Sequence, residues 1–462
     1  MAVSRRLDWL DMMLALLILA LAGGVRGWYL VTFAQGGDVA AFAVWQTQQP
    51  PERYQGDLTE LDRLVANIKE HGPLAGFRCP APLSAGEELT AHIAPGYPYF
   101  RAYLEIAANW IGYGDKPAVV VRWVQVGLGA FTAMLYFLIA RRAFASVVVG
   151  LLAGLGAAFY PFWVINVAEL QDGVLATFLI ALVLDLAITA GQKAGALSSL
   201  LLGLVLAAAC LTRASFLPFA AVLLMWFMLR SRSLPQGWLC ALVAFFGFLS
   251  GQSWWLVRDF QELKAPMPLV SSAWWHVWVG NNPLSYGGPA TRDMKTLLAD
   301  READLAGTPQ AHRYAKLAES VKSEIFNEPS QTLVRRGKAL LYYLFGTKSP
   351  NRNTIIEKGN GPEIEPWVKN VIMGSLVGLL PLALLGWRWS YGWKQASAPI
   401  ALAIYWLPLP YFLTHAEHLH GPRLPLDGAL ICLAALAVGC LLPVVGRPLL
   451  EGESAVSTSE AD

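Results

Sequence analysis

Residues 170–190 read LQDGVLATFLIALVLDLAITA, an apolar run with one acidic residue at its start, Asp172, and another near its end, Asp185. A helix rises about 1.5 Å per residue, so a run of this length covers the roughly 30 Å hydrocarbon core of a bilayer. The stretch therefore predicts a membrane span.

Nine further apolar runs share this character. They lie near 10–30, 118–140, 145–165, 195–212, 214–229, 236–257, 368–387, 397–414 and 424–446. Of the 462 residues, 55% are hydrophobic and only 15% are charged, whereas soluble domains carry about a quarter charged residues. The pattern predicts an all-α polytopic membrane protein with about ten transmembrane helices.

Basic residues beside the short loops predict how the spans are oriented, because cytoplasmic loops are enriched in Lys and Arg. The basic flanks that fall on one side are Arg5, Arg6, Arg141, Arg142, Lys193, Arg230, Arg232, Arg388, Lys394 and Arg447. This pattern places both termini in the cytoplasm. The first run could instead be a signal peptide, because it has a basic start and the small residues Ala22, Gly23 and Gly24. Its cleavage would leave the later topology unchanged.

The topology divides the chain into four parts. An N-terminal membrane domain covers 1–257 and includes a first outer loop at 31–117. A helical outer loop follows at 258–367, then the C-terminal membrane helices at 368–447 and an acidic tail at 448–462, expected to be disordered.

Two helices are expected in the outer loops. Segment 97–113 is apolar, but making it a span would invert every later flank, so we expect a helix lying at the membrane interface. The second loop carries apolar residues at helical spacing, Tyr314, Leu317, Val321 and Ile325, followed by Leu333, Leu340 and Leu344 with basic residues between them. These features predict a juxtamembrane first loop and a helical second loop.

Charged residues gather where spans meet the predicted outer surface. These are Glu169, Asp172, Arg213, Arg258 and Arg423. Ionisable groups near a bilayer are costly unless they are paired or functional. Acidic residues also stabilise helix starts and arginines extend to lipid headgroups, so a purely structural reading of each residue stays open.

Other classes of site find little support. The five cysteines show no CxxC spacing, and the histidines and glutamate at 415–420 match no zinc pattern. The net charge of +2 without a long basic run gives no indication of nucleic-acid binding.

Four stretches occur in an order typical of one superfamily. They are HIAPGYPYFRAYL at 92–104, LTRASFLPF at 211–219, WWLVRDFQELKAPMPLVSSAWWHVWVGNNP at 254–283 and HGPRLPLDGALICLAALAV at 420–438. Together they resemble the GT-C superfamily of glycosyltransferases that use lipid phosphosugars. The likeness is nearest to the protein O-mannosyltransferase and aminoarabinose transferase branch.

The resemblance implies a carboxylate base in the first outer loop. Two aspartates compete for this role: Asp38 lies nearer the first span, and Asp57 better fits the register of the residues that follow it. The second acidic position of the family falls on Asp172, with Glu169 one turn away, and in some relatives such carboxylates hold Mg²⁺ or Mn²⁺. Without the resemblance, either loop aspartate would be interpreted as a helix N-cap.

The resemblance also implies a membrane glycosyltransferase of a bacterial inner membrane. A polyprenyl-phosphate sugar would be the donor, and the acceptor would be a protein, lipid or glycan whose hydroxyl is glycosylated with inversion on the non-cytoplasmic face. Arg213, Arg258 and Arg423 would hold the phosphate, and His92 would contact the sugar or phosphate or pack its own loop.

Two other functions remain open from the sequence. A transporter or flippase predicts charged or broken segments at the bilayer midplane, where Asp185 alone gives weak support. A non-catalytic protein of envelope polysaccharide assembly could share the fold without the chemistry. A co-purifying polyprenyl-phosphate lipid would favour the enzyme.

Overall fold

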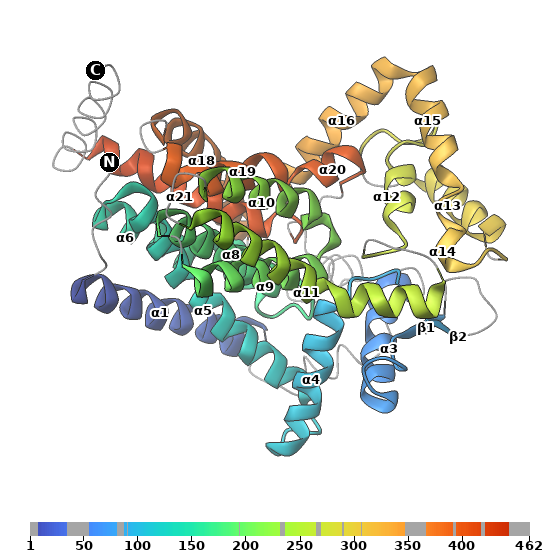
Figure 1. Cartoon of the computed structure of the whole chain (residues 1–462), viewed down its shortest axis with the longest axis horizontal. Helices are drawn as coiled ribbons and strands as arrows, with labels where there is room; N and C mark the ends of the chain where they lie inside the picture. The colour runs from blue at the N-terminus through green and yellow to red at the C-terminus, as the bar shows by residue number, and fades with distance from the viewer. Residues whose placement is uncertain are drawn as a thin grey trace.

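The computed structural model is a bundle of helices with further helices gathered at one end (Figure 1). It describes residues 8–34, 55–80, 87–89, 91–193, 195–231, 236–264, 269–288, 291–305, 307–346, 366–390, 394–416 and 421–442. The predicted tail at 448–462 lies outside the described residues.

Helices occur at all ten predicted spans. They are α1 (Trp9–Tyr29), α5 (Pro117–Phe144), α6 (Val147–Phe159) with α7 (Pro161–Asn166), α8 (Gly173–Gln192), α9 (Ala196–Thr212), α10 (Leu217–Ser231), α11 (Gly237–Leu263), α18 (Pro366–Trp389), α19 (Lys394–Trp406) with α20 (Leu409–Leu413), and α21 (Leu424–Leu441). Within the described residues, seven helical stretches are long and apolar enough to cross a membrane. The chain is a helical polytopic membrane protein, and the count of ten crossings stays a prediction.

The predicted span at 145–165 is broken rather than continuous. Tyr160 is extended, with φ −61° and ψ 113°, and Pro161 begins the short α7. Proline lacks the backbone N–H that would continue the ladder, and the residue before a proline is disfavoured in the helical region. After the break, residues 161–172 connect α6 to the start of α8.

The loops fold mainly into short helices. The described elements are η1 (Leu30–Ala34), α3 (Gln55–His71), β1 (Arg78–Pro80), β2 (Glu87–Leu89), α4 (Gly96–Trp110), η2 (Ala214–Phe216), α12 (Ala273–Val279), α13 (Arg292–Leu305), α14 (Gln310–Arg313), α15 (Leu317–Asn327) and α16 (Pro329–Leu344). Strands β1 and β2 pair antiparallel, with Arg78 opposite Leu89. The helical second loop is therefore confirmed, and α4 is the helix expected at 97–113, although its place at the membrane interface stays a prediction.

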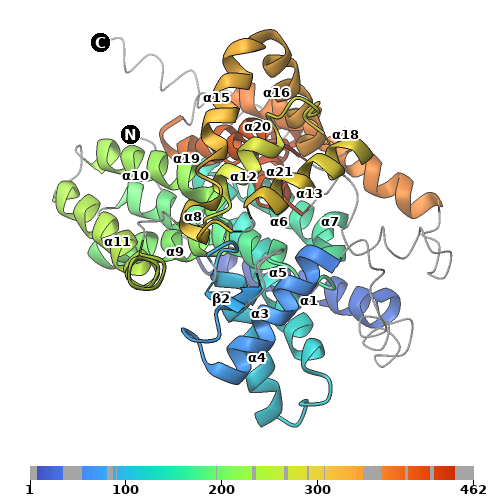
Figure 2. The ribbon, with the colours of Figure 1, turned by 90° about the vertical axis from the view of Figure 1, so that its right-hand side faces the viewer.

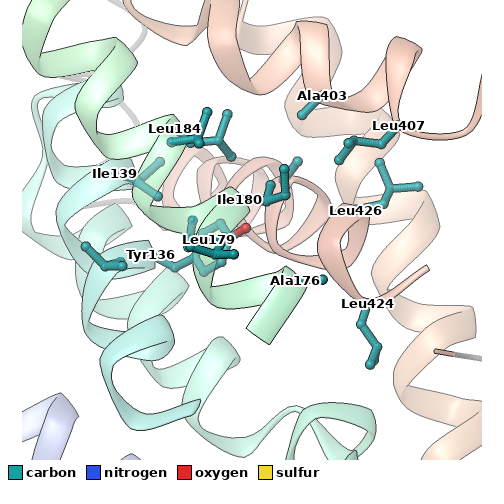
Figure 3. Packing of buried hydrophobic residues seen from close by; sticks show 14 of the residues in the cluster. Tyr136, Ile139, Ala176, Leu179, Ile180, Leu184, Ala403, Leu407, Leu424 and Leu426 are labelled. Atoms are coloured by element: carbon teal, nitrogen blue, oxygen red, sulfur yellow. The ribbon is translucent and has the colours of Figure 1, made fainter. Parts of the chain in front are cut away.

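The buried core lies between α5, α8 and α21. Tyr136 of α5, Leu179 and Ile180 of α8, and Leu424 and Leu426 of α21 belong to one apolar cluster (Figure 3). Nearly every described residue of α21 is buried, so this helix is the centre of the bundle. Burial of this apolar surface leaves the polar residues at the two ends of the helices.

The two ends of the bundle carry different side chains. At one end Arg141 Nε donates to Asp11 Oδ1 at 2.9 Å, and Arg142 pairs with Asp185, so ion pairs join α1, α5 and α8. At the other end, α3 and α4 lie on one side, and α15 and α16 on the opposite side (Figure 2). Arg141 and Arg142, two of the predicted basic flanks, thus lie at the end of the bundle opposite the loop helices.

Candidate functional site

An ion pair between Asp172 and Arg213 lies at the loop end of the bundle, the end that carries α3, α4, α15 and α16. Asp172 is the N-cap of α8, and Arg213 follows the last residue of α9 in an extended conformation. Arg213 Nε donates to Asp172 Oδ2, and Nη2 donates to Oδ1 at 2.8 Å. A fork of two parallel bonds fixes the orientation of both groups. Burial alone would lower the pKa of Arg213, but Asp172 outweighs it and the pKa lies above its usual range.

Arg213 also connects this pair to the start of α21. Its Nη1 donates to the carbonyl oxygens of Gly421 at 3.2 Å and Pro422 at 3.3 Å. These two residues precede Arg423, the N-cap of α21. The predicted residues Asp172, Arg213 and Arg423 are therefore brought together by one short segment.

Arg423 is fully buried at this junction. Its Nε donates to Asp427 Oδ1 at 2.8 Å, one turn along α21. Its Nη1 donates to the carbonyl oxygens of Leu344 at 2.6 Å and Gly346 at 2.9 Å, where α16 ends. The guanidinium carbon lies 4.7 Å from the centre of the Phe162 ring. Arg423 thus joins the second outer loop to the last span.

Glu169 lies on the segment between α7 and α8 and is buried. Side chains of α5 hold this segment: Arg122 Nε donates to the Ala168 carbonyl at 2.9 Å, and Gln125 Nε2 donates to the Glu169 carbonyl at 2.8 Å. Arg122 is also an electrostatic neighbour of the Glu169 carboxylate. Tyr97 of α4 donates to Gln125 Oε1 at 3.1 Å, which links α4 to the same network.

Gly96, in the proline-glycine-tyrosine-proline turn, explains how α4 approaches the site. A Cβ atom at this position would lie 2.7 Å from Thr212 Oγ1 and 2.8 Å from Thr212 Cα. Glycine permits such close backbone contact because it has no Cβ. The turn therefore packs directly beside Arg213.

An ionic network holds α3 against α4. Glu105 accepts from Lys69 Nζ and from Arg101 Nε, each at 2.8 Å, and Arg101 Nη1 donates to Asp62 at 2.6 Å. The apolar side chains Leu64, Val65 and Ile68 are buried beneath this network. Helix α3 is thus fixed to the helix that contacts the Asp172 and Arg213 pair.

The two candidate base residues are placed differently. Asp57 lies in the first turn of α3, but its side chain is outside the described part of the structure. Asp38 lies wholly outside the described residues. The choice between them stays a prediction.

Arg258 belongs to a second cluster, at the C-terminal part of α11. Its Nη1 donates to Asp259 Oδ1 at 2.8 Å, and Nη2 donates to the Phe77 carbonyl at 3.1 Å. The guanidinium also lies over Trp255, 4.6 Å from the ring centre. Trp255 in turn donates to the Leu269 carbonyl at 3.1 Å. These contacts hold the first outer loop and residue 269 against α11.

His92 lies where the first and second outer loops meet. Its carbonyl accepts from Ser272 Oγ at 2.8 Å, and its ring centre lies 5.8 Å from that of Tyr314. Burial, together with the neighbouring His276 and Arg313, lowers the pKa of His92 to about 3. The imidazole is therefore neutral at physiological pH.

A small cavity lies just inside the Asp172 and Arg213 pair. Its walls include Gly173, beside Asp172, and Leu424, beside Arg423, together with Arg26, Asn166 and Thr177. Arg26 is fully buried and donates to the carbonyls of Ala22, Ala157 and Ala158, the last two near the end of α6. This cation acts as a helix C-cap.

Asp172 does not fit a divalent cation in this arrangement. Both carboxylate oxygens accept from Arg213, whose positive charge would repel a metal ion. No group of three His, Cys, Asp or Glu side chains suited to a metal was found in the described part of the chain. A Mg²⁺ or Mn²⁺ ion stays a prediction.

Sequence reasoning missed several residues of the network. Arg26, Arg122 and Asp427 all lie within predicted apolar runs. A charge inside such a run is a signal in itself, because it is costly without a partner. The i, i+4 spacing of Arg423 and Asp427 was a second signal, since it brings two side chains together on a helix.

Comparisons with known proteins found solved structures only. No family model matches, and no curated protein matches. The apo oligosaccharyltransferase of Archaeoglobus fulgidus has a TM-score of 0.48 and 11% identity over 94% of this chain and 51% of that chain. The complex of archaeal oligosaccharyltransferase AglB from the same organism with an inhibitory peptide and a dolichol-phosphate has a TM-score of 0.47 and 13% identity, over 93% of this chain and 50% of that chain.

Both structures are of an oligosaccharyltransferase from Archaeoglobus fulgidus. The chain spans about half the length of these structures. At such low identity and TM-score, neither their activity nor their ligands transfer to this chain. The nearer branch stays a prediction.

Proposed function

We propose that this chain is a membrane glycosyltransferase that transfers a sugar from a polyprenyl-phosphate donor to an acceptor hydroxyl, with inversion, on the non-cytoplasmic face. The observation that carries the proposal is the meeting of Asp172, Arg213 and Arg423 at the loop end of the bundle, beside the helices of the first outer loop. The ordered motifs supply the reaction class, and this geometry is what such chemistry needs.

The reaction makes three demands on the protein. The acceptor hydroxyl must be aligned with the anomeric carbon, its proton must be removed, and charge on the departing phosphate must be stabilised. The new bond joins the acceptor oxygen to the anomeric carbon while the bond from that carbon to the phosphate oxygen breaks. The electron pair leaves with the polyprenyl phosphate, and the hydroxyl proton passes to a carboxylate.

The residues are assigned to these tasks as follows. Asp57, or Asp38 in its place, takes the proton. Arg213 and Arg423 stabilise the phosphate, and Asp172 fixes the orientation of Arg213 through its two hydrogen bonds. The Glu169 carboxylate, on the segment that leads to Asp172, interacts electrostatically with Arg122.

Two further residues have supporting roles. His92 is neutral at physiological pH, so it offers a hydrogen bond to the sugar or phosphate rather than a charge. Arg258 is assigned to the phosphate as well, although Asp259 and the Phe77 carbonyl already occupy its two Nη atoms. A phosphate would have to bind beside these acceptors, one of which is a carboxylate.

The base assignment is tested by transfer activity in membranes that carry Asp57→Asn or Asp38→Asn at matched protein levels. One variant should lose most activity, and the other should keep it. Glu70→Gln is the matched control, because Glu70 is an exposed acid on the same helix α3. Normal turnover in both aspartate variants would show that neither residue is the base.

The donor assignment is tested by Arg258→Ala. Activity should need a higher concentration of the lipid donor, while the rate at saturating donor changes less. Unchanged donor dependence would remove the phosphate role of Arg258. A chain that binds a polyprenyl-phosphate lipid but transfers no sugar with any donor would instead support the flippase or the assembly protein.

A further inference from the structure

Helix α16 presents an apolar face to its surroundings and a basic face to the protein. Its exposed side includes Leu333, Val334, Leu341 and Phe345, which are 71%, 57%, 56% and 44% exposed. Its buried side carries Arg335 and Arg336, each about 5% exposed or less. A helix at a water-facing surface has the reverse arrangement, with apolar residues inward and charges outward.

The buried arginines form hydrogen bonds to neighbouring elements. Arg335 Nη1 donates to Glu324 Oε1 of α15 at 2.9 Å, and its Nη2 donates to Glu328 Oε2 at 3.4 Å. Arg336 donates to the carbonyl oxygens of Phe412, Thr414 and Gly280. The orientation of α16 is therefore fixed by hydrogen bonds, so the exposure of its apolar side is not a matter of free rotation.

The C-terminal end of α16 lies beside the ends of membrane helices. Arg423 at the start of α21 binds the carbonyls of Leu344 and Gly346, and Tyr343 stacks on Tyr411 of α20 with ring centres 4.7 Å apart. Figure 1 shows α16 leaving the bundle at an angle beside α20. The apolar side thus begins where the spans end.

Two neighbouring exposed residues extend the same surface. Phe326, just before the turn between α15 and α16, is 80% exposed, and Leu413 at the end of α20 is 48% exposed. Leu413 belongs to a helical stretch that is apolar enough to cross the membrane, and α16 packs against this stretch through Tyr343 on Tyr411 and through Arg336, which donates to the Phe412 carbonyl. The exposed face has one charge, Lys338, which suits contact with lipid phosphates.

We infer that α16 rests on the outer leaflet of the bilayer, with Leu333, Val334, Leu341 and Phe345 among the lipid chains. The occupant of this face is the lipid surface, because α16 packs against α20, which ends a stretch apolar enough to cross a membrane, and because an exposed apolar patch in water would favour association. This contact keeps the C-terminal end of α16 at the membrane surface, where the Leu344 carbonyl accepts a hydrogen bond from Arg423.

The test uses the full chain reconstituted in vesicles of phosphatidylcholine and phosphatidylglycerol. An environment-sensitive fluorophore is attached to Val334→Cys or Leu341→Cys in a Cys79→Ser background; the other four cysteines are buried. Lys322→Cys on α15 is the matched control, because Lys322 is exposed and lies on the neighbouring helix. Quenching is measured with doxyl-labelled phosphatidylcholine and, separately, with aqueous iodide.

The fluorophore at 334 and 341 should emit at shorter wavelength than at 322, lose most of its signal to the doxyl lipid and resist iodide. Iodide quenching equal to that at 322 would place the face in water and overturn the inference. Protection from both quenchers would mean that protein, either another segment or a second copy, covers the face, and this result would overturn it as well.

Discussion

The pairing of Asp172 with Arg213 gives the sharpest prediction. Arg213→Lys keeps the charge but replaces a planar fork by a single ammonium group, which cannot reproduce two parallel bonds to one carboxylate. Asp172→Asn removes the charge of the acceptor and leaves Arg213 in the same place. If the two residues act together, each change disturbs the same arrangement.

The magnitude follows from the bonds that are lost. A hydrogen bond to a charged group contributes about 1.5–3 kcal/mol. The Asp172 side chain is 29% exposed, so the lower value applies. Two bonds then correspond to about 3 kcal/mol. At about 1.4 kcal/mol per factor of ten, kcat/KM for sugar transfer should fall about tenfold in a variant that keeps one bond and about a hundredfold in one that loses both.

The double variant decides between shared and separate roles. For residues that act as a unit, Asp172→Asn with Arg213→Lys should be no worse than the poorer single variant. Independent contributions would multiply the losses of the two single variants. The assay is transfer from a polyprenyl-phosphate sugar in proteoliposomes, with protein amount and thermal unfolding measured for each variant. Multiplying effects would refute the view that Asp172 acts through Arg213.

Asp185→Asn is the control for general damage to α8. It breaks the pair with Arg142 at the opposite end of the same helix. It should lower thermal stability without changing kcat/KM. A loss of transfer as large as that of Asp172→Asn would mean that the effect reports helix packing rather than the site.

Three further predictions concern the loop end. Gly96→Ala should lower stability by about 1–3 kcal/mol and reduce transfer, because its Cβ would meet Thr212 at 2.7 Å. The control Gly127→Ala should be tolerated, because a Cβ there has no atom within 4 Å. Equal thermal unfolding of the two variants would contradict the steric argument. Glu105→Gln removes the negative charge shared by Lys69 and Arg101 and one of the two acceptor oxygens, and should cost about 2 kcal/mol. Unchanged protease cleavage within α3 would show that the network does not hold this helix. Burial lowers the pKa of His92 and of His415 to about 3, below the usual value near 6.5, so their contribution to stability is complete above about pH 6.5 and is lost as the pH falls toward 3. The melting temperature should therefore drop on acidification. His415→Gln should make the melting temperature depend less on pH. A pH dependence as steep as that of the parent chain would exclude His415 as its cause.

The spans were predictable because each is a long run of residues that only a bilayer or a core can accommodate. Helices stand at every predicted run, and Arg141, Arg142 and Asp185 meet at one end as the alternation of basic flanks implies. The break at Tyr160 could have been expected from Pro161, but hydropathy averages over such a residue. Hydropathy defines how long a helix can be, and proline chemistry defines where it stops.

The pairings at the site were less predictable. Arg213 and Asp172 lie 41 residues apart, and Arg213 reaches a carbonyl 209 residues away. Periodicity describes one helix at a time and holds no information on which helix ends meet. The resemblance pointed to Asp172, Arg213 and Arg423 as candidate site residues, and the structure brings these three together; it could not show that Arg258 would instead lie with Asp259 and Phe77.

The donor groups already in use limit how a phosphate could bind. Arg213 has five N–H groups, and four of them donate to Asp172, Gly421 and Pro422, so a phosphate can gain one bond there without displacing an acceptor. Arg423 uses Nε and Nη1, while its Nη2 has no hydrogen-bond acceptor among the described residues. Under the proposed function, a phosphate therefore adds bonds at Arg423, whereas at Arg213 it can add one bond before any acceptor has to be displaced. Because Arg423 is fully buried, part of its surroundings must move before a lipid phosphate can reach Nη2; the carbonyls of Leu344 and Gly346, which bind Nη1, belong to these surroundings.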